Sequence, residues 1–134
     1  MNKRNVLLHY HIFKTAGTSF ERVLINNFDQ NHLSFDGPTA SSYISQKDLI
    51  KVIESNSNLA SLSSHQISLP APVSDQFLAL PVVFVRHPIL RICSVFLHEH
   101  RQAATRSQSP LQGFEACFDK LVADHPNQLQ IGNL

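Results

Sequence analysis

The segment from Lys14 to Ser19 combines several groups that bind anions. It holds a lysine, a glycine and three hydroxyl side chains, in the order Lys14, Thr15, Ala16, Gly17, Thr18 and Ser19. An apolar run precedes it and a helical pattern follows, so free N–H groups and the positive end of a helix converge on it. The segment predicts a phosphate site. A strand-to-helix turn with a hydroxyl cap and a surface lysine is the alternative.

The order of these residues differs from that of a Walker A loop. That motif places its lysine after the glycines, whereas Lys14 precedes Gly17 in this chain. The sequence therefore disfavours an ordinary ATP or GTP hydrolase.

A second cationic segment, from Arg86 to Ser94, repeats the strand, loop and helix arrangement. Arg86 follows the apolar run 82–85, and ligands of open α/β sheets bind at such strand ends. One polar stripe of the predicted helix carries side chains at helical spacing, namely Arg91, Ser94, His98 and Arg101. Arg86 and Ser94 could share one phosphate. A solvated basic face of an amphipathic helix is the alternative.

Alternating strands and helices must position these two segments. Apolar runs predict strands at 6–13, 59–63 and 82–85, with a loop at 31–42. Helical spacing predicts helices at 19–28, between 45 and 56, from 88 to about 103, and from 109 onward. Two pairs fit N-terminal helix caps, Thr18 with Glu21 and Ser45 with Asp48. This order favours a parallel α/β sheet flanked by helices, which we expect to be incomplete at the C-terminus.

Composition favours a single globular domain over residues 1–134. Of the 134 residues, 43% are hydrophobic and 16% charged, which excludes a disordered chain. A net charge of +1 offers no broad basic field for nucleic acid. Cys93 and Cys117 match neither a disulfide framework nor a zinc motif. We recognise no signal peptide and no membrane-spanning run, so we expect a cytoplasmic protein.

Together the two cationic segments resemble the sulfotransferases that use 3′-phosphoadenosine 5′-phosphosulfate (PAPS), especially the carbohydrate branch with the heparan sulfate 2-O-sulfotransferases. That family has a Pro-Lys-Thr-[Ala/Gly]-Gly-Thr-[Ser/Thr] loop and a later Arg-Asp-Pro-x-x-Arg-x-x-Ser segment. The corresponding residues here are 13–19 and 86–94, in the same order and each after an apolar run. Phe13 replaces the usual proline, and His87 the frequent aspartate.

The resemblance implies a P-loop-related fold. It also implies transfer of a sulfuryl group from PAPS to a hydroxyl group of a carbohydrate. It implies that Lys14 stabilises charge on the leaving 5′-phosphate. The rest of the loop would cradle that phosphate, through Thr15, Ala16, Gly17, Thr18 and Ser19. Arg86 and Ser94 would hold the 3′-phosphate. The resemblance implies no metal and leaves the oligomeric state open.

Such a transfer needs a general base, and histidine fits because its ordinary pKa lies near neutrality. His65 follows the predicted strand 59–63 and lies between the two motifs, where the resembling branch has a base histidine. A polar loop histidine fits this position equally well. The other histidines form no metal motif: His98 and His100 point apart on a helix, and two strand histidines lack a third ligand. These two are His9 and His11.

Two alternatives to an active sulfotransferase stay open. A non-catalytic remnant of the same fold would bind the bisphosphate nucleotide without transfer. A nucleotide-dependent kinase with a variant loop would bind ATP with Mg²⁺, and it needs an acidic metal ligand that neither motif offers.

Overall fold

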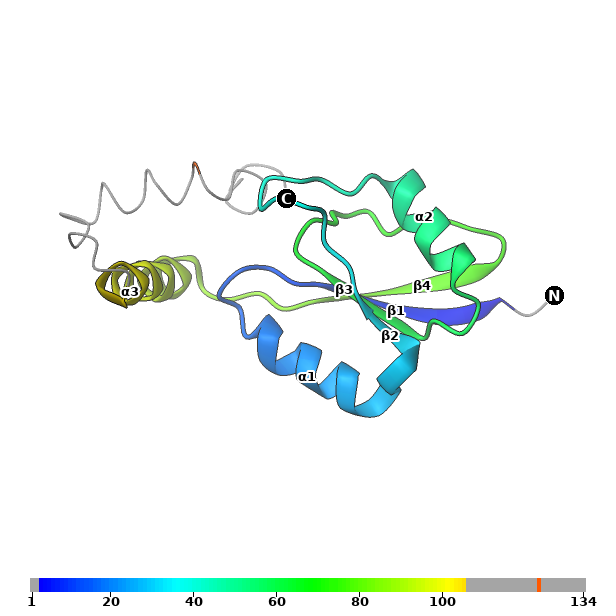
Figure 1. Ribbon diagram of the computed structural model, residues 1–134, viewed down its shortest axis with the longest axis horizontal. Coiled ribbons are helices and arrows are strands. Elements are labelled where there is room, and N and C mark those ends of the chain that lie inside the picture. The colour runs from blue at the N-terminus through cyan, green and yellow to red at the C-terminus, as the bar shows by residue number, and fades with distance from the viewer. Residues whose placement is uncertain (1–2, 106–122, 124–134) are drawn as a thin grey trace.

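The computed structural model of the chain describes residues 3–105 and residue 123. Within them the elements follow the order β1 (Arg4–Tyr10), α1 (Gly17–Phe28), η1 (Asp29–Asn31), β2 (His32–Ser34), α2 (Gln46–Ser55), β3 (Ser61–Ser64), β4 (Phe77–Val83) and α3 (Pro88–Thr105). Figure 1 shows α1 on one side of the sheet and α2 on the other. This is the alternation of strands and helices that the sequence predicts.

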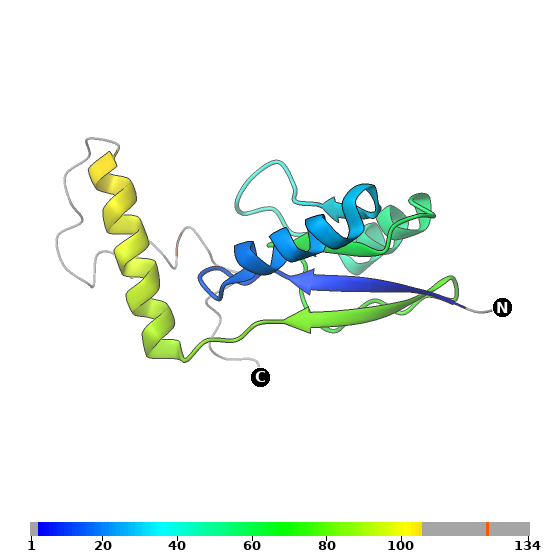
Figure 2. The same ribbon diagram turned by 90° about the horizontal axis from the view of Figure 1, so that it is seen from below.

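The four strands form one sheet in the order β2-β3-β1-β4, and every neighbouring pair is parallel. In the middle of the sheet, Leu8 of β1 lies opposite Leu62 of β3 and Pro81 of β4. All carboxyl ends therefore meet at one edge, where the loops of an open α/β sheet bind ligands (Figure 2). The structure confirms the predicted parallel α/β class.

Alternation along β1 separates an apolar layer from a polar one. Val6, Leu8 and Tyr10 are buried in the core with α2, because alternate side chains of a strand share a face. The core contains Val6, Leu8, Tyr10, Ile44, Leu49, Ile53, Leu59, Leu62, Ile67 and Phe77. His9 is fully buried on the opposite face of β1, where its ring meets Phe20 of α1. The layer under α1 is thus built around a histidine.

Helix α2 begins as the sequence predicts. The hydroxyl oxygen of Ser45 accepts the backbone N–H of Asp48 over 3.2 Å, which satisfies one of the free N–H groups at the helix start. At the other end, the guanidinium of Arg4 donates to the carbonyl oxygens of Ile53 and Asn56. This positive group stabilises the C-terminal end of the helix dipole and ties α2 to β1.

Helix α1 begins differently from the prediction. Its N-cap is Ala16, in a left-handed conformation and without a side-chain hydrogen bond, so the predicted capping pair of Thr18 and Glu21 is wrong. The Glu21 carboxylate instead accepts the hydroxyl of Ser34 over 2.6 Å. Because the helix already begins at Gly17, Thr18 lies inside it and cannot be its N-cap.

The strand boundaries also differ from the sequence-based ones. β1 ends at Tyr10, three residues before the predicted end at Phe13, because the chain turns there. β2 lies inside the predicted loop 31–42. β4 begins at Phe77 and contains Pro81, which is tolerated because β4 lies at the edge of the described sheet.

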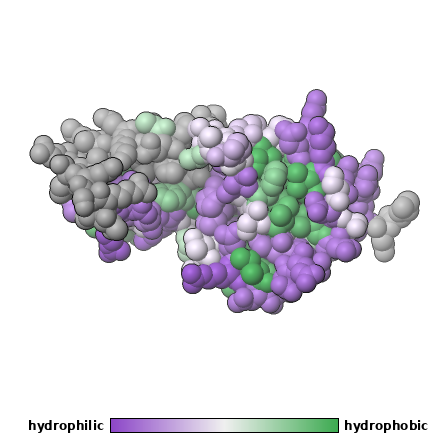
Figure 3. Space-filling view, viewed as in Figure 1, coloured by the Kyte–Doolittle hydropathy of each residue, from purple (hydrophilic) through white to green (hydrophobic). Residues whose placement is uncertain are grey.

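Helix α3 begins at Pro88, as predicted, and runs across the carboxyl-end side of the sheet (Figure 2). Figure 3 shows apolar side chains gathered between α2 and α1, with hydrophilic ones around them. In the part of the chain that the structure describes, no helix has the length and apolar character needed to cross a membrane. The helix predicted from residue 109, and Cys117 with it, lie outside the described residues.

Candidate functional site

The loop between β1 and α1, residues 11–16, turns sharply because two of its residues adopt left-handed backbone angles. Lys14 has a φ of 62° and Ala16 a φ of 71°, values that cost energy in any residue with a Cβ. The hydroxyl of Thr15, itself buried, donates to the carbonyl oxygen of Ile12 over 2.9 Å and closes the turn. With no side-chain cap at Ala16, the first N–H groups of α1 point to where an anion can bind.

The His11 ring packs directly against Gly17, the first residue of α1. A Cβ built on Gly17 would lie 2.0 Å from Cδ2 and 2.4 Å from Nε2 of His11. No side chain fits into such a space, so glycine is required for the loop to close over the ring. His11 is therefore part of the architecture of the predicted phosphate loop.

The segment after β4 reaches the same loop through two arginines. The exposed Arg86 donates Nη1–H to the carbonyl oxygen of Lys14 over 3.4 Å. Arg91 of α3 donates Nε–H to the carbonyl oxygen of Phe13 over 3.0 Å. The structure thus brings Arg86 to the predicted phosphate loop.

The structure does not bring Ser94 to that arginine. Ser94 is half-buried on α3, and within residues 3–105 no hydrogen bond joins it to Arg86 or to the loop. Its hydroxyl and the Arg86 guanidinium would have to meet through a bound phosphate.

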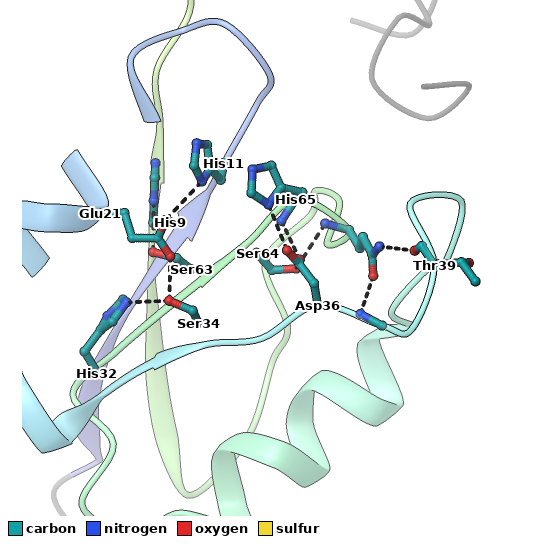
Figure 4. A network of polar contacts seen from close by, with 12 residues as sticks. His9, His11, Glu21, His32, Ser34, Asp36, Thr39, Ser63, Ser64 and His65 are labelled. Atoms are coloured by element: carbon teal, nitrogen blue, oxygen red, sulfur yellow. Dashed lines mark hydrogen bonds and ion pairs between the residues drawn. The ribbon is translucent and has the colours of Figure 1, made fainter. Parts of the chain in front are cut away.

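His65 directly follows β3 and is held by one carboxylate, that of Asp36, which follows β2. Its Nδ1 lies 2.8 Å from Oδ2 of Asp36, and its backbone N–H donates to Oδ1 over 2.8 Å. The hydroxyl of Ser64 donates to the same Oδ1 over 2.8 Å. Asp36 therefore fixes both the backbone and the ring of His65 (Figure 4).

These hydrogen bonds also determine the ionisation of Asp36. Burial raises the pKa of the carboxyl, but the hydrogen bonds from His65 and Ser64 outweigh burial, and the pKa lies below its ordinary value. Asp36 is a carboxylate at neutral pH and accepts the Nδ1–H of His65. In that tautomer Nε2 of His65 is the unprotonated nitrogen, and a general base needs an unprotonated nitrogen.

Three histidine rings form a row that begins in β1 and ends at His65. His11 stacks on His65 with ring centroids 3.9 Å apart and on His9 with centroids 5.1 Å apart (Figure 4). Burial, and next the charge of His11, lower the pKa of His9 to about 4. Burial, and next the charge of His65, lower the pKa of His11. His9 and His11 are thus neutral at pH 7, and His11 links the base candidate to Gly17.

A second carboxylate, that of Glu21 on α1, lies beside His11 in this row. Its Oε2 lies 3.5 Å from Nδ1 of His11, and its Oε1 accepts the Ser34 hydroxyl. Next to Ser34, Nδ1 of His32 lies 2.8 Å from the hydroxyl oxygen of Ser61. The layer between α1 and the sheet is therefore a polar network that leads to His11 (Figure 4).

The sequence reasoning missed Asp36 and Glu21 as partners and treated His11 only as a histidine without a metal motif. One signal for Asp36 was present: residues 32–35 alternate polar and apolar, which indicates a strand, and an acid follows. Among residues 3–105 and 123, no group of three or more histidine, cysteine or acidic side chains is arranged to hold a metal ion.

Comparison with known proteins supports the family that the two segments resemble. The sequence profile of the Sulfotransferase family matches residues 1–129. An uncharacterized protein of Archaeoglobus fulgidus is 34% identical over 106 residues, which cover 74% of this chain and 40% of that protein. The chain thus spans less than half the length of this relative. No solved structure matches the chain significantly. Because the family profile covers nearly the whole sequence, the chain belongs to the sulfotransferase family.

Proposed function

We propose that this chain binds PAPS and transfers its sulfuryl group to a hydroxyl group of a carbohydrate acceptor. One observation carries the proposal: the His11 ring touches both Gly17 of the loop and the ring of His65. A donor phosphate on the loop and an oxygen deprotonated by His65 would therefore lie in one site. Membership of the sulfotransferase family supports the type of reaction.

In this reaction the acceptor oxygen attacks sulfur while the bond between sulfur and the 5′-phosphate oxygen breaks. Nε2 of His65 takes the proton of the attacking hydroxyl, and Asp36 stabilises the imidazolium that forms. Lys14 stabilises the charge that develops on the leaving phosphate. The products are a sulfated acceptor and adenosine 3′,5′-bisphosphate.

The donor contacts follow from the loop and from the arginine beside it. The 5′-phosphate binds to the segment Lys14, Thr15, Ala16, Gly17, Thr18 and Ser19. Because the Thr15 hydroxyl is engaged with Ile12, Thr15 contributes its backbone N–H rather than its side chain. Arg86 and Ser94 hold the 3′-phosphate, a charge-assisted contact for the arginine. A single-domain extent over residues 1–134 remains a prediction.

Nucleotide binding separates this proposal from its alternatives. Calorimetry with the wild-type chain should show tighter binding of adenosine 3′,5′-bisphosphate than of 5′-AMP, because the second phosphate adds a contact to Arg86. Equal affinities for the two nucleotides would contradict the proposal. Preference for ATP with Mg²⁺ would favour the kinase alternative.

Replacement of the base separates an enzyme from a nucleotide-binding remnant. His65→Ala should leave bisphosphate affinity nearly unchanged and lower transfer from PAPS to desulfated heparan sulfate by about 10²–10⁴-fold. Wild-type turnover in this variant would remove His65 from the mechanism. Bisphosphate binding without transfer to any glycan by the wild-type chain would favour the remnant.

A further inference from the structure

His11 is buried in the middle of the candidate site, between the loop glycine and three titratable side chains. Its side chain is 7% exposed and lies between Gly17 of the loop and the ring of His65. Glu21 faces its Nδ1 at 3.5 Å, and His9 stacks on its ring from β1. A packing role alone would be met by an apolar side chain of similar shape.

One ring nitrogen of His11, Nδ1, is not satisfied as it usually is in a structural histidine. Its Nδ1 is buried and forms no hydrogen bond with any of the described residues, and 3.5 Å from Glu21 is an ion-pair distance. A closer pair of the same two groups lies beside it, where Nδ1 of His65 is 2.8 Å from the carboxylate of Asp36. Two imidazole–carboxylate pairs thus stand ring against ring (Figure 4).

We propose that His11 with Glu21 and His65 with Asp36 form one unit that binds a single proton in addition to the N–H of each neutral ring. In this unit His11 is a positioning residue. This rests on the proposed role of His65 as the base. Two imidazolium rings stacked at 3.9 Å repel each other strongly, so the unit holds one proton and not two. The two carboxylates stabilise that proton.

Burial distinguishes the two rings and keeps His11 neutral. His11 is the more deeply buried of the two rings, with 7% of its side chain exposed against 39% for His65. Burial, and next the charge of His65, lower the pKa of His11, while the carboxylates of Glu21 and Asp36 oppose that decrease. His11 therefore stays neutral and stacks on the ring that takes the proton.

The position of His11 also joins the base to the donor loop. The ring fills the space beside Gly17 and supports His65 on its other side. A shift of the loop must therefore move the His11 ring, and a shift of that ring must move His65. The unit keeps the attacking oxygen aligned with the donor phosphate, and a misplacement of about 1 Å can lower a rate about 10²-fold.

Titration of the histidine ring signals by NMR tests the coupling of the two rings directly, on the full chain and without any ligand. In wild type, His11 should titrate below the ordinary histidine range. His65→Gln, at a half-exposed position, should raise the pKa of His11 by removing a neighbouring charge, and Glu21→Gln should lower it by removing an attraction. His32→Gln is the matched control: His32 is in the same network but has no contact with His11.

An unchanged His11 titration in His65→Gln would overturn the proposal, because the two rings would then hold protons independently. A His11 titration that moves in the control variant as much as in His65→Gln would overturn it as well. The titration needs neither PAPS nor an acceptor, so a failure of nucleotide binding contradicts the proposed function and leaves the result on the histidine pair intact.

A kinetic measurement tests the positioning role. His11→Gln should lower turnover about 10²-fold at saturating PAPS, and the dependence of turnover on pH should change, because the second imidazole of the pair is gone. Turnover and pH profile equal to those of wild type in a folded His11→Gln variant would overturn the assignment.

Discussion

At the scale of single residues, Asp36 determines what His65 can do. One carboxylate accepts the backbone N–H and the ring Nδ1 of His65, and a third hydrogen bond from Ser64. The ring is thereby held in one tautomer and one orientation. Without the carboxylate, His65 would be a half-exposed loop histidine, which is the alternative that the sequence alone leaves open.

Asp36→Asn tests this control over the tautomer. The amide keeps the size of the side chain but loses the negative charge, so Nδ1–H of His65 is no longer favoured. We expect turnover to fall by about 10²–10⁴-fold, while adenosine 3′,5′-bisphosphate binds as tightly as before. Asp48→Asn is a matched control, because Asp48 is also hydrogen-bonded to a serine, Ser45, but lies in the first turn of α2. Wild-type turnover in Asp36→Asn would contradict the orienting role.

The two cations of the donor site can be tested by binding alone. Lys14→Ala and Arg86→Ala each remove a charge-assisted contact to a phosphate, worth about 1.5–3 kcal/mol. Calorimetry should show at least about tenfold weaker binding of the bisphosphate in each variant, with an unchanged circular dichroism spectrum. Lys51→Ala, at an exposed lysine of α2, is the control. Unchanged affinity in either site variant would remove that residue from the donor site.

At the scale of elements, the junction of the loop and α1 has two adjacent residues with opposite requirements. Ala16 has a left-handed backbone that a glycine adopts more easily, so Ala16→Gly should raise the free energy of unfolding by about 0.5–1 kcal/mol. Gly17→Ala places a Cβ 2.0 Å from the His11 ring, so it should destabilise the fold and weaken bisphosphate binding. Denaturant unfolding of both variants measures the two effects, and tolerance of Gly17→Ala would contradict the packing of His11.

Elements whose start depends on neighbouring residues could be predicted from the sequence. The Ser45 cap of α2 and the proline at the start of α3 act within one turn, and both are where the pattern places them. The predicted cap of α1 failed because the helix begins at Gly17, which places Thr18 inside it, and Glu21 instead contacts Ser34, thirteen residues away in the chain. The sequence predicts a loop at β2, only His32–Ser34, because the alternation over residues 32–35 is short and lies in a polar segment with Gly37 and Pro38.

In the candidate site, too, the local features could be predicted from the sequence and the long-range contacts could not. The loop and Arg86 are local motifs, and the structure brings them together. The partners of His65 could not be derived from the sequence. Asp36 lies 29 residues away from His65 in the chain, and the His11 ring reaches His65 only because β1 pairs in parallel with β3. The pairing of strands, and not the spacing of residues, brings these groups together.

At the scale of the whole molecule, the sheet separates an apolar core from a buried polar layer. The core lies on the side of α2, and the histidine row lies on the side of α1. Buried polar groups cost free energy unless they are paired, so an apolar layer would support α1 with a smaller loss of stability. The polar layer is explained if it positions the candidate site at the carboxyl ends of the strands, where the row of histidines ends at His65.

The buried histidines should make the stability of the whole molecule depend on pH. His9 is fully buried, and its pKa is lowered from 6.5 to about 4, so the folded state binds fewer protons than the unfolded chain between these values. The free energy of unfolding should therefore decrease as pH falls from about 6.5 to about 4, by about 3 kcal/mol from His9 alone. Denaturant unfolding across this range measures the slope.

A variant without this imidazole isolates its contribution to the pH dependence. His9→Asn keeps a polar atom for the hydroxyl of Ser63 but cannot be protonated, so the decrease in stability between pH 6.5 and 4 should become shallower. Its stability at pH 7 will also be lower because the side chain is smaller, and the slope is therefore the diagnostic quantity. His87→Gln, at an exposed histidine, should keep the wild-type slope. A wild-type slope in His9→Asn would show that His9 is not the residue that must be protonated on unfolding.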